Sequence, residues 1–409
     1  MPAVDFIELS IEESPVYDGA PAAAPYRVST DKLYLPARSG VIRPSPQHLD
    51  RSDELRGLLS APARLIETYQ PSGALSVRAY ARILTWLLHL SGFTGVRTAG
   101  GTTVPDGNAT QTTAIVAAAA ATVPVVDTSQ FPSTGSLVSG GTAFTYTGKT
   151  ATSFTGCTST PGMASGATVN GVAPTGTSKW VFDKRDAIDA KTAQIRINYA
   201  TEQLLSLGNG YAVSQLTLNA LGEVAAELMG LVFKRQAVDT TTVPAMVAQS
   251  IPPFRRRELY LRWLTGGGRV ADFNLTIANA VERVNSLGVA SPTPYPDALE
   301  HGDEQVQVTG SIPKRILDAD DVDALLSAAT FAALAYWRST ATIAVTGYPY
   351  SVWVDLPACQ YVDGAPGEMG NKRRYGMDSL DFFAAHSETA GYDARVVLVN
   401  DVAAIETFV

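Results

Sequence analysis

The residues Thr147-Gly148-Lys149-Thr150 match the end of the phosphate-binding loop found in nucleotide-binding proteins. That loop also needs a glycine five residues before Gly148, a strand before it and a helix after it. Ala143 occupies the glycine position, and the residues after Lys149 are β-formers without a helical period. Aromatic residues alternate with threonines on both sides of Gly148-Lys149, a pattern typical of strands. The segment therefore predicts a β-hairpin that turns at Gly148-Lys149, and no nucleotide site.

Other residue patterns that could support catalysis or ligand binding are incomplete. The segment Gly266–Ala271 fits the spacing of a dinucleotide-binding loop, but a strand pattern follows it where a helix is required. No Gly-x-Ser-x-Gly motif marks a nucleophilic serine. Asp355 and Asp363 are far in sequence from any obvious acid partner. The four histidines have no metal-ligand spacing: His48, His89, His301 and His386. We therefore expect no catalytic, cofactor-binding or metal-binding residues, and no enzyme.

Charged clusters have simpler explanations than binding sites. Arg255–Arg257 and Lys372–Arg374 are the basic clusters, and we interpret them as solvated or salt-bridging surfaces. The acidic run Asp318–Asp323 lacks the glycine and terminal glutamate of a calcium loop, so we interpret it as the first turn of a helix. Cys157 and Cys359 allow one disulfide without implying it.

Composition narrows the class of protein. The chain has 409 residues, of which 45% are hydrophobic and 17% charged, and a net charge of −8. An acidic chain of this length predicts two or three folded domains and argues against a surface that binds nucleic acid. The N-terminus has no basic start followed by an apolar run, and no apolar stretch is long enough to cross a bilayer. We expect a soluble protein made in the cytoplasm.

One segment differs in composition from the rest of the chain. Residues 103–178 are rich in Thr, Ser, Gly and Ala and contain only Asp106, Asp127 and Lys149 as charges. Proline and glycine turns separate short β-patterned runs and flank the segment at both ends. We predict a small all-β module inserted at residues 105–174.

The surrounding sequence alternates between helical and β patterns. Ser76–Ser91 and Asp318–Trp337 have the apolar spacing of amphipathic helices, the first with Ser76 as N-cap. Residues 211–234 predict a long β-hairpin that turns at Leu221-Gly222. A proline-rich link follows, and the later strands are expected at residues 272–277, 304–312, 341–347, 350–358, 379–387 and 394–400.

The order of elements suggests an internal duplication. RVSTDKLYL and LIETYQPSGAL precede the first helix, and RVADFNLTI and QVQVTGSI precede the second. Strands follow the helix in both halves. The alternative is one large α+β domain whose halves are alike by chance.

Two quoted segments resemble those of tailed-bacteriophage virion proteins. SLVSGGTAFTYTGKTATSFTGCT is similar to small β-modules of such proteins, and GYAVSQLTLNALGEVAAELMGLVFKR resembles the long hairpin of siphophage-like tail tube proteins, also called major tail proteins. In the second half, VTGSI, VWVDLPA, SLDFFAAH and ARVVLVN resemble further strands of that family.

The resemblance implies a mainly β (α+β) fold with two tandem tail-tube-type β-barrel or sandwich domains. Each would carry one packed amphipathic helix, and the inserted all-β module would project from the exterior. Residues 1–104 and 175–250 would form the first tube domain, residues 105–174 the module, and residues 251–409 the second tube domain.

The implied function is structural. The protein would form rings that stack into the tail tube, as a homotrimer with pseudo-six-fold symmetry or alternatively a homohexamer. Tape measure, tail-terminator and tip proteins would be its partners, in the virion tail after assembly in the host cytoplasm. Genomic DNA would pass through without specific binding, and no cofactor or membrane is implied.

An acidic or neutral lumen would let DNA slide, because basic residues would bind its phosphates. We expect Glu202, Glu223 and Glu227 to line that lumen, with ring-to-ring contacts or solvent as the alternative places for them. Extended loops at Ala37–Ala63 and Cys359–Gly376 are expected to make ring-to-ring contacts. The alternative functions are another non-catalytic virion protein (hub, terminator or capsid decoration) and a carbohydrate-binding or carbohydrate-degrading β-protein.

Overall fold

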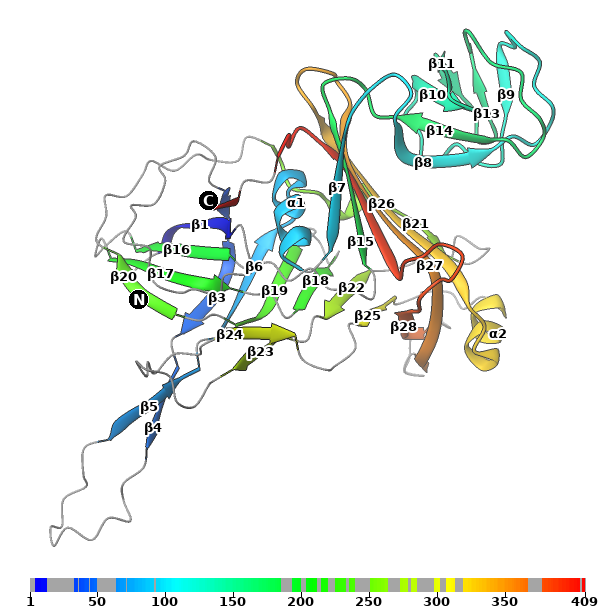
Figure 1. Cartoon of the computed structure of the whole chain (residues 1–409). Helices are drawn as coiled ribbons and strands as arrows, with labels where there is room; N and C mark the ends of the chain where they lie inside the picture. The colour runs from blue at the N-terminus through cyan, green and yellow to red at the C-terminus, as the bar shows by residue number, and fades with distance from the viewer. Residues whose placement is uncertain are drawn as a thin grey trace, which may run out of the picture.

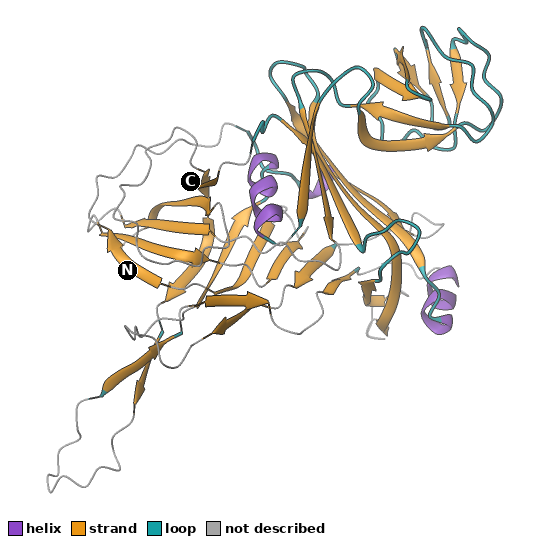
Figure 2. Cartoon of the chain, in the orientation of Figure 1, coloured by secondary structure: helices purple, strands orange, loops and turns teal. Residues whose placement is uncertain are grey.

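The computed structural model is mainly β, with two α-helices and several antiparallel sheets among the described residues (Figure 1). The described residues are 4–12, 33–35, 37–43, 45–49, 64–70, 72–91, 93–184, 193–199, 204–211, 215–219, 225–232, 235–239, 251–263, 273–278, 281–284, 298–301, 307–312, 319–366, 377–404 and 407–408. Figure 2 shows how little of this part is helical.

Thirteen strands form one hydrogen-bonded network, which bends into two layers. The first layer, called the broad sheet here, has eight strands. In spatial order they are β3 (Ala37–Arg43), β6 (Ser72–Arg78), β19 (Ala225–Val232), β18 (Gln215–Asn219), β22 (Asn274–Ala278), β25 (Gln307–Ser311), β28 (Met377–Ala384) and the C-terminal part of β27 (Pro349–Pro366). All of its neighbouring strands are antiparallel.

The second layer, called the second sheet, shares strand β27 with the broad sheet. Residues 351–355 of β27 pair with β29, whereas residues from Cys359 onward pair with β28. The other strands are β21 (Leu259–Trp263), β26 (Phe331–Thr342), β29 (Ala394–Asn400), β15 (Ser178–Lys184) and β7 (Thr94–Ala99). Strands before residue 250 and after residue 251 therefore pair within both layers.

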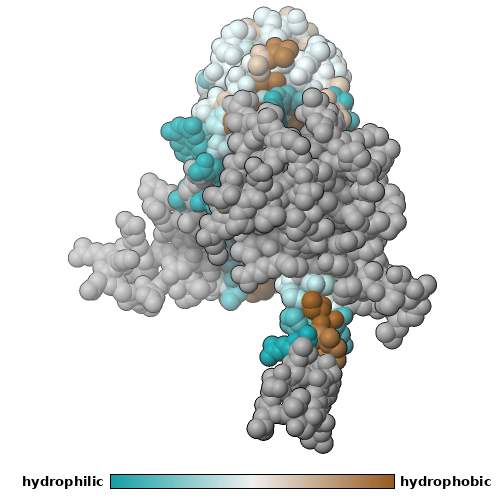
Figure 3. Space-filling model, turned by 90° about the vertical axis from the view of Figure 1, so that its left-hand side faces the viewer, coloured by the Kyte–Doolittle hydropathy of each residue, from teal (hydrophilic) through white to brown (hydrophobic). Residues whose placement is uncertain are grey.

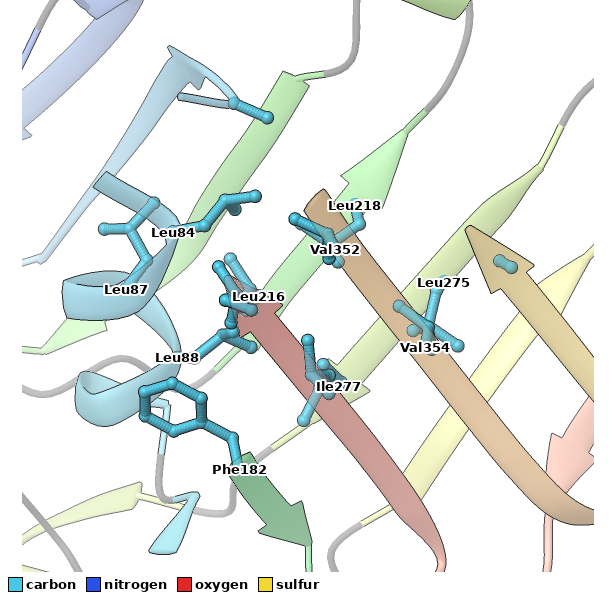
Figure 4. Packing of buried hydrophobic residues seen from close by; sticks show 14 of the residues in the cluster. Leu84, Leu87, Leu88, Phe182, Leu216, Leu218, Leu275, Ile277, Val352 and Val354 are labelled. Atoms are coloured by element: carbon cyan, nitrogen blue, oxygen red, sulfur yellow. The ribbon is translucent and has the colours of Figure 1, made fainter. Parts of the chain in front are cut away.

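The main hydrophobic core lies between the two layers. Figure 4 shows Leu216 and Leu218 of β18, with Leu275 and Ile277 of β22, pointing toward Val352 and Val354 of β27. These six side chains are at most 3% exposed. Alternate residues of each strand face this core, which is the period-2 pattern of a β-sandwich. The sandwich therefore leaves the opposite face of the broad sheet to other contacts.

Helix α1 (Ala81–Leu90) fills one end of this core with Leu84, Leu87 and Leu88, and Leu88 lies beside Phe182 of β15 (Figure 4). We expected the helix to begin at Ser76, but Ser72–Arg78 is strand β6, paired on one side with β3 and on the other with β19. The helix is also buried on nearly all sides and not along one face. Pairing on both edges of β6 outweighs the helical spacing of its apolar residues.

Helix α2 (Ala319–Ser327) is half as long as we expected. The expected helix continued to Trp337, yet residues 331–342 form strand β26, paired with β21 and β27. Ala328, with a φ of 51°, follows the helix in the left-handed region, a common way for a helix to end. The apolar residues of FAALAYW fit the spacing of a helix as well as that of a strand. Pairing with β21 and β27 stabilises the strand.

A further sheet lies beside the broad sheet (Figure 1). It has the order β2 (Leu33–Leu35), β1 (Val4–Glu12), β16 (Ala193–Tyr199), β17 (Leu204–Tyr211), β20 (Arg235–Asp239), with β30 (Thr407–Phe408) parallel to β1. Two hairpins complete the body. They are β4 (Pro46–Leu49) with β5 (Leu65–Tyr69), and β23 (Val281–Val284) with β24 (Ala298–His301).

Residues 105–172 fold as a small unit, called the β-module here. One sheet has the order β11 (Thr142–Tyr146), β10 (Gly135–Ser139), β14 (Thr168–Val172), β8 (Pro105–Gln111), and the other has the order β12 (Gly148–Lys149), β13 (Ser153–Thr155), β9 (Thr122–Pro124). Its own hydrophobic cluster includes Phe131, Phe144 and Phe154. We expected the turn at Gly148-Lys149, but these residues pair with Thr155 and Phe154, and the turn follows at residues 150–152.

Several expected strands are confirmed. The hairpin of residues 211–234 appears as β18 and β19, paired from Gln215–Met229 to Asn219–Ala225. Its turn lies outside the described residues. The strands expected near residues 274, 307, 350, 379 and 394 are β22, β25, β27, β28 and β29. The strand expected at residues 341–347 was wrong in its second half, where the Ile343 carbonyl accepts from the N–H groups of Thr346 and Gly347 in a turn.

Candidate functional site

The three glutamates expected to line a channel are only partly covered by the structure. Glu202 and Glu223 lie outside the described residues. Glu227 lies in β19, opposite Ser76 of β6 on one side and Thr217 of β18 on the other. Because residues opposite one another share a face of a sheet, Glu227 belongs to the face that carries Ser76 and Thr217.

This face of the broad sheet carries a row of mainly small polar residues that crosses all eight strands. In register order the row is Ser39, Ser76, Glu227, Thr217, Thr276, Thr309, Phe383 and Gln360. The hydroxyl groups of Thr217 and Thr276 lie 3.2 Å apart, and the Gln215 side chain donates to Thr217 over 3.3 Å. Phe383 is the one large apolar member. We call this surface the polar face.

A second row on the polar face contains three charged residues. It runs Arg78, Ala225, Asn219, Asn274, Ser311, Asp381 and Asp363. The side chains of Arg78, Asp381 and Asp363 are exposed. With Glu227, these two rows contain three acidic residues and one basic residue. These two rows are therefore mildly acidic, and a polyanion would find few cations along them.

Within the described residues, the broad sheet does not close on itself. At one end β3 pairs only with β6 among the described residues, and at the other the residues of β27 after Cys359 pair only with β28. Val362, on this second edge, is 64% exposed. Unpaired strand edges favour pairing with another chain. Among the described strands, the sheet thus has two free edges, one from each half of the sequence.

The hairpin of β4 and β5 projects away from the body (Figure 1). It carries a hydrophobic strip, visible at the lower part of Figure 3, formed by Leu49, Leu65 and Ile66, which are 45%, 52% and 46% exposed. We expected loops at Ala37–Ala63 and Cys359–Gly376, but Ala37–Arg43, Pro46–Leu49 and Cys359–Pro366 are strands. The rest of these two segments, apart from Ser45, lies outside the described residues.

Lys149, the lysine of the phosphate-loop fragment, has a structural role in the β-module. Its ammonium group donates to the backbone carbonyls of Thr128, Phe131 and Ser129 over 2.7, 2.6 and 3.4 Å. Burial lowers the pKa of this lysine. Three carbonyl acceptors use the donors that a nucleotide phosphate would need. The other fragment, Gly266–Ala271, lies outside the described residues.

Several other charged groups considered in the sequence, where the structure describes them, are engaged in local structure. The Arg255 backbone N–H donates to the Glu258 carboxylate over 2.9 Å at the start of a short 3-10 helix, and residues 372–374 lie outside the described residues. Asp321 is buried and accepts a hydrogen bond from Tyr361 over 2.9 Å, which ties α2 to β27. His386 lies 2.7 Å from Asp393. In the described part of the chain, no three His, Cys, Asp or Glu side chains are grouped to hold a metal ion.

The cysteines are both free and buried, Cys157 in the β-module and Cys359 in the main core. Burial raises the pKa of the Cys359 thiol to about 12, so the thiol stays protonated. Among the described helices, none is both long and apolar enough to cross a membrane.

The attachment of the β-module is a buried polar contact that sequence reasoning missed. Asp106, 1% exposed, accepts hydrogen bonds from Tyr348 and from the backbone and side chain of Asn108. Asn108 in turn accepts from the Trp353 indole over 2.8 Å. Burial raises the pKa of Asp106, although its hydrogen bonds and Arg338 oppose the shift. The sequence held one clue to this contact. Asp106 is one of only three charged residues in a long segment that is otherwise uncharged.

Two further hydrogen bonds join the β-module to the second sheet. Tyr260 donates to Asp127 over 3.3 Å, and Arg338 donates to the backbone carbonyl of Gln130. The donors come from β21 and β26, whereas the Asp106 contact uses the β26–β27 turn and β27. The β-module is therefore held at several separate points and not only by its two connecting strands.

Comparison with known proteins adds no assignment. No protein-family model matches this chain, and no curated protein matches it.

Proposed function

We propose that this protein is the tube subunit of a bacteriophage tail, forming rings that stack around a channel for DNA. The observation that carries the proposal is the broad sheet: eight strands, one face packed on the core, the other face polar and mildly acidic, and both edges free. This arrangement suits a segment of a larger barrel whose interior is filled with water.

Barrel geometry supports closure by several copies. Closed barrels of about eight strands have interiors filled by side chains, whereas about 16–18 strands leave an aqueous channel. The described strands of the broad sheet leave it open in a single chain. Three copies joined edge to edge would exceed the larger number and leave a wide lumen, in agreement with the expected trimer.

The free edges supply the lateral contact. Pairing of the β27 edge of one copy with β3 of the next would continue the antiparallel or parallel ladder around the ring and leave no edge exposed. A cyclic arrangement repeats this heterologous contact until it closes. The polar face would then line the channel, and the second sheet, α1 and the β-module would lie outside it.

Two tandem tube domains remain part of this proposal. The first would contribute β3, β6, β19 and β18 to the broad sheet, and the second β22, β25, β28 and β27. Four strands from each half fit a pseudo-repeat. The second sheet would be shared by the two domains, because β7 and β15 of the first half pair within it beside β29 of the second half.

Stacking requires contacts along the tube axis, and the hairpin of β4 and β5 is suited to them. Its exposed Leu49, Leu65 and Ile66 would be buried against the neighbouring ring. Tape measure, terminator and tip proteins would be the partners of this stack of rings, as the resemblance implies. Electron microscopy of the purified protein, together with its mass in solution, tests this proposal: rings that stack into tubes would support it, and a protein that stays monomeric would contradict it.

A further inference from the structure

A cleft of about 660 Å³ lies where the β-module meets the outer face of the second sheet. The β-module contributes Pro105, Gly107 and Ala109 from β8, with Gln130 and Asn170 nearby. The floor comes from β15, β21, β26, β27 and β29. Clefts of about 300–1,000 Å³ at the junction of two folded units are common places for small ligands.

The floor of the cleft combines a charged row with an apolar row. Arg262, Leu334, Asp355 and Arg395 lie opposite one another on four successive strands. The adjacent row on the same face contains Trp353, Val397 and Val181. Lys179 lies two residues before Val181 on β15 and therefore faces the same side. A ligand here would meet cations and an apolar surface together.

The cations outnumber the acids. Among the residues that line the cleft, Lys179, Arg262 and Arg395 are basic, and Asp355 is the acidic one. This balance is opposite to that of the whole chain, which has a net charge of −8. Asp355 is already engaged, because it accepts a hydrogen bond from Tyr392 over 2.7 Å.

The cations also differ in their partners. Arg395 donates to both oxygens of Asp183, over 2.6 and 2.9 Å. Neither Lys179 nor Arg262 has an ion-pair partner within the part of the chain that the structure describes. Burial lowers the pKa of Lys179 and Arg395 lowers it further, with Asp106 opposing. The lowered pKa means that keeping this partly buried ammonium group charged costs free energy. A bound anion would offset that cost.

We propose that this cleft binds a small molecule that carries a carboxylate or phosphate group on an uncharged body. Lys179 and Arg262 would contact the oxyanion, because neither forms an ion pair among the described residues, whereas Arg395 is bound to Asp183. Phe331, Val181 and Val397 would contact the body. The inference does not depend on a tube: the cleft lies within one chain, on the face of the second sheet opposite the core.

Isothermal titration calorimetry of the full-length protein tests the proposal with four probes. Glucuronate and glucose 6-phosphate offer a carboxylate and a phosphate on the same sugar body, glucose offers the body alone, and inorganic phosphate the anion alone. We expect at least one sugar anion to bind, more weakly at higher salt, and about tenfold or more tighter than glucose. Whichever sugar anion binds tighter identifies the group. Absence of binding by both sugar anions, or equal binding of glucose, overturns the proposal.

Variants separate the cleft from other surfaces. Lys179→Met and Arg262→Gln should each weaken binding of the tighter probe about tenfold or more, while Arg256→Gln removes an exposed cation outside the cleft and should leave it unchanged. Ala332→Trp fills the cleft without removing charge and should also abolish binding, which covers the case in which Lys179→Met fails to fold. Equal losses in Arg256→Gln, or full binding by Arg262→Gln and Ala332→Trp, would contradict the assignment.

Discussion

The indole N–H of Trp353 donates to the side-chain oxygen of Asn108 over 2.8 Å, although the two residues are 245 positions apart. Both side chains are at most 1% exposed. The bond joins β27, the strand shared by both layers of the sandwich, to the first strand of the β-module. The orientation of the β-module is therefore coupled to the main core.

A double-mutant cycle on this pair should show strong coupling. Asn108→Ala leaves the Trp353 N–H buried without its acceptor, and we expect a loss of about 1–3 kcal/mol in the free energy of unfolding. Trp353→Phe removes the donor, so the double variant should lose less than the sum of the single losses, by about 0.5 kcal/mol or more. Urea titration measures all four proteins. Strict additivity would show that the bond does not hold the β-module.

Asp106 should make stability depend on pH. Its folded pKa is raised above the ordinary 3.8, so the folded state holds the proton more tightly than the unfolded state. The contribution of Asp106 to stability is therefore largest below pH 3.8 and falls as the pH rises through 3.8 toward the folded pKa. Asp106→Asn does not titrate. Its stability relative to the natural protein should improve between pH 4 and pH 7, measured by urea unfolding, and a constant difference would contradict this.

Lys184 should give the opposite slope at alkaline pH. Burial lowers its pKa from 10.5 to about 8, so the unfolded state binds more protons between these values. Stability should rise with pH across this window, by about 3 kcal/mol at about 1.4 kcal/mol per pKa unit. Tyr350, whose pKa is raised to about 12, acts in the other direction above pH 10. The readout is therefore the difference from Lys184→Met, which should grow in favour of the natural protein from pH 8 to 10.

The sequence predicted the strands better than their partners. The alternation in residues 274–278 identified a strand, because Leu275 and Ile277 are buried on one face, whereas the apolar run of residues 394–400 identified a strand that is buried on both faces. Ser76 and Phe331 were assigned to helices, since their neighbours fit a period of 3.6 and only the pairing of β6 and β26 on both edges excludes it. That pairing is long-range: Ser76 lies opposite Glu227, which no local pattern reveals.

Of the two candidate sites, the sequence could indicate part of the polar face but not the cleft. Glu227 could be assigned to a strand face from its position in the hairpin, but the row from Ser39 to Gln360 requires the register of eight strands. The cleft could not be predicted, because Lys179, Arg262 and Arg395 are isolated basic residues in the sequence and converge only through pairing of distant strands.

Charge reversal on the polar face should slow DNA passage without preventing assembly. Glu227→Lys with Asp381→Lys places cations on the surface proposed to line the channel, where they would attract phosphates. In a phage that carries this gene, we expect normal tails and slower DNA release, and more so at low salt. Glu388→Lys, a matched change of an exposed residue outside the broad sheet, serves as the control. Equal rates of DNA release from all intact particles would contradict the assignment of the polar face to the lining of the channel.

A lysine on the free edge of β27 should block ring closure. Val362, 64% exposed, would be covered by the neighbouring chain in the ring, and a buried unpaired ammonium group is costly there. We expect Val362→Lys to weaken association more than tenfold, as measured by sedimentation, with an unchanged circular dichroism spectrum. Val345→Lys, at a residue 84% exposed in the turn after β26, should assemble normally. Similar behaviour of the two variants would place the ring contact elsewhere.

The most direct test of the tube is negative-stain electron microscopy of the purified protein, together with its mass in solution. The account predicts rings with a central channel that stack into tubes, and a ring mass of three protomers. Six protomers in each ring would keep the tube and reject the pseudo-six-fold trimer. A protein that stays monomeric at all concentrations, and forms neither rings nor tubes, would contradict the central claim.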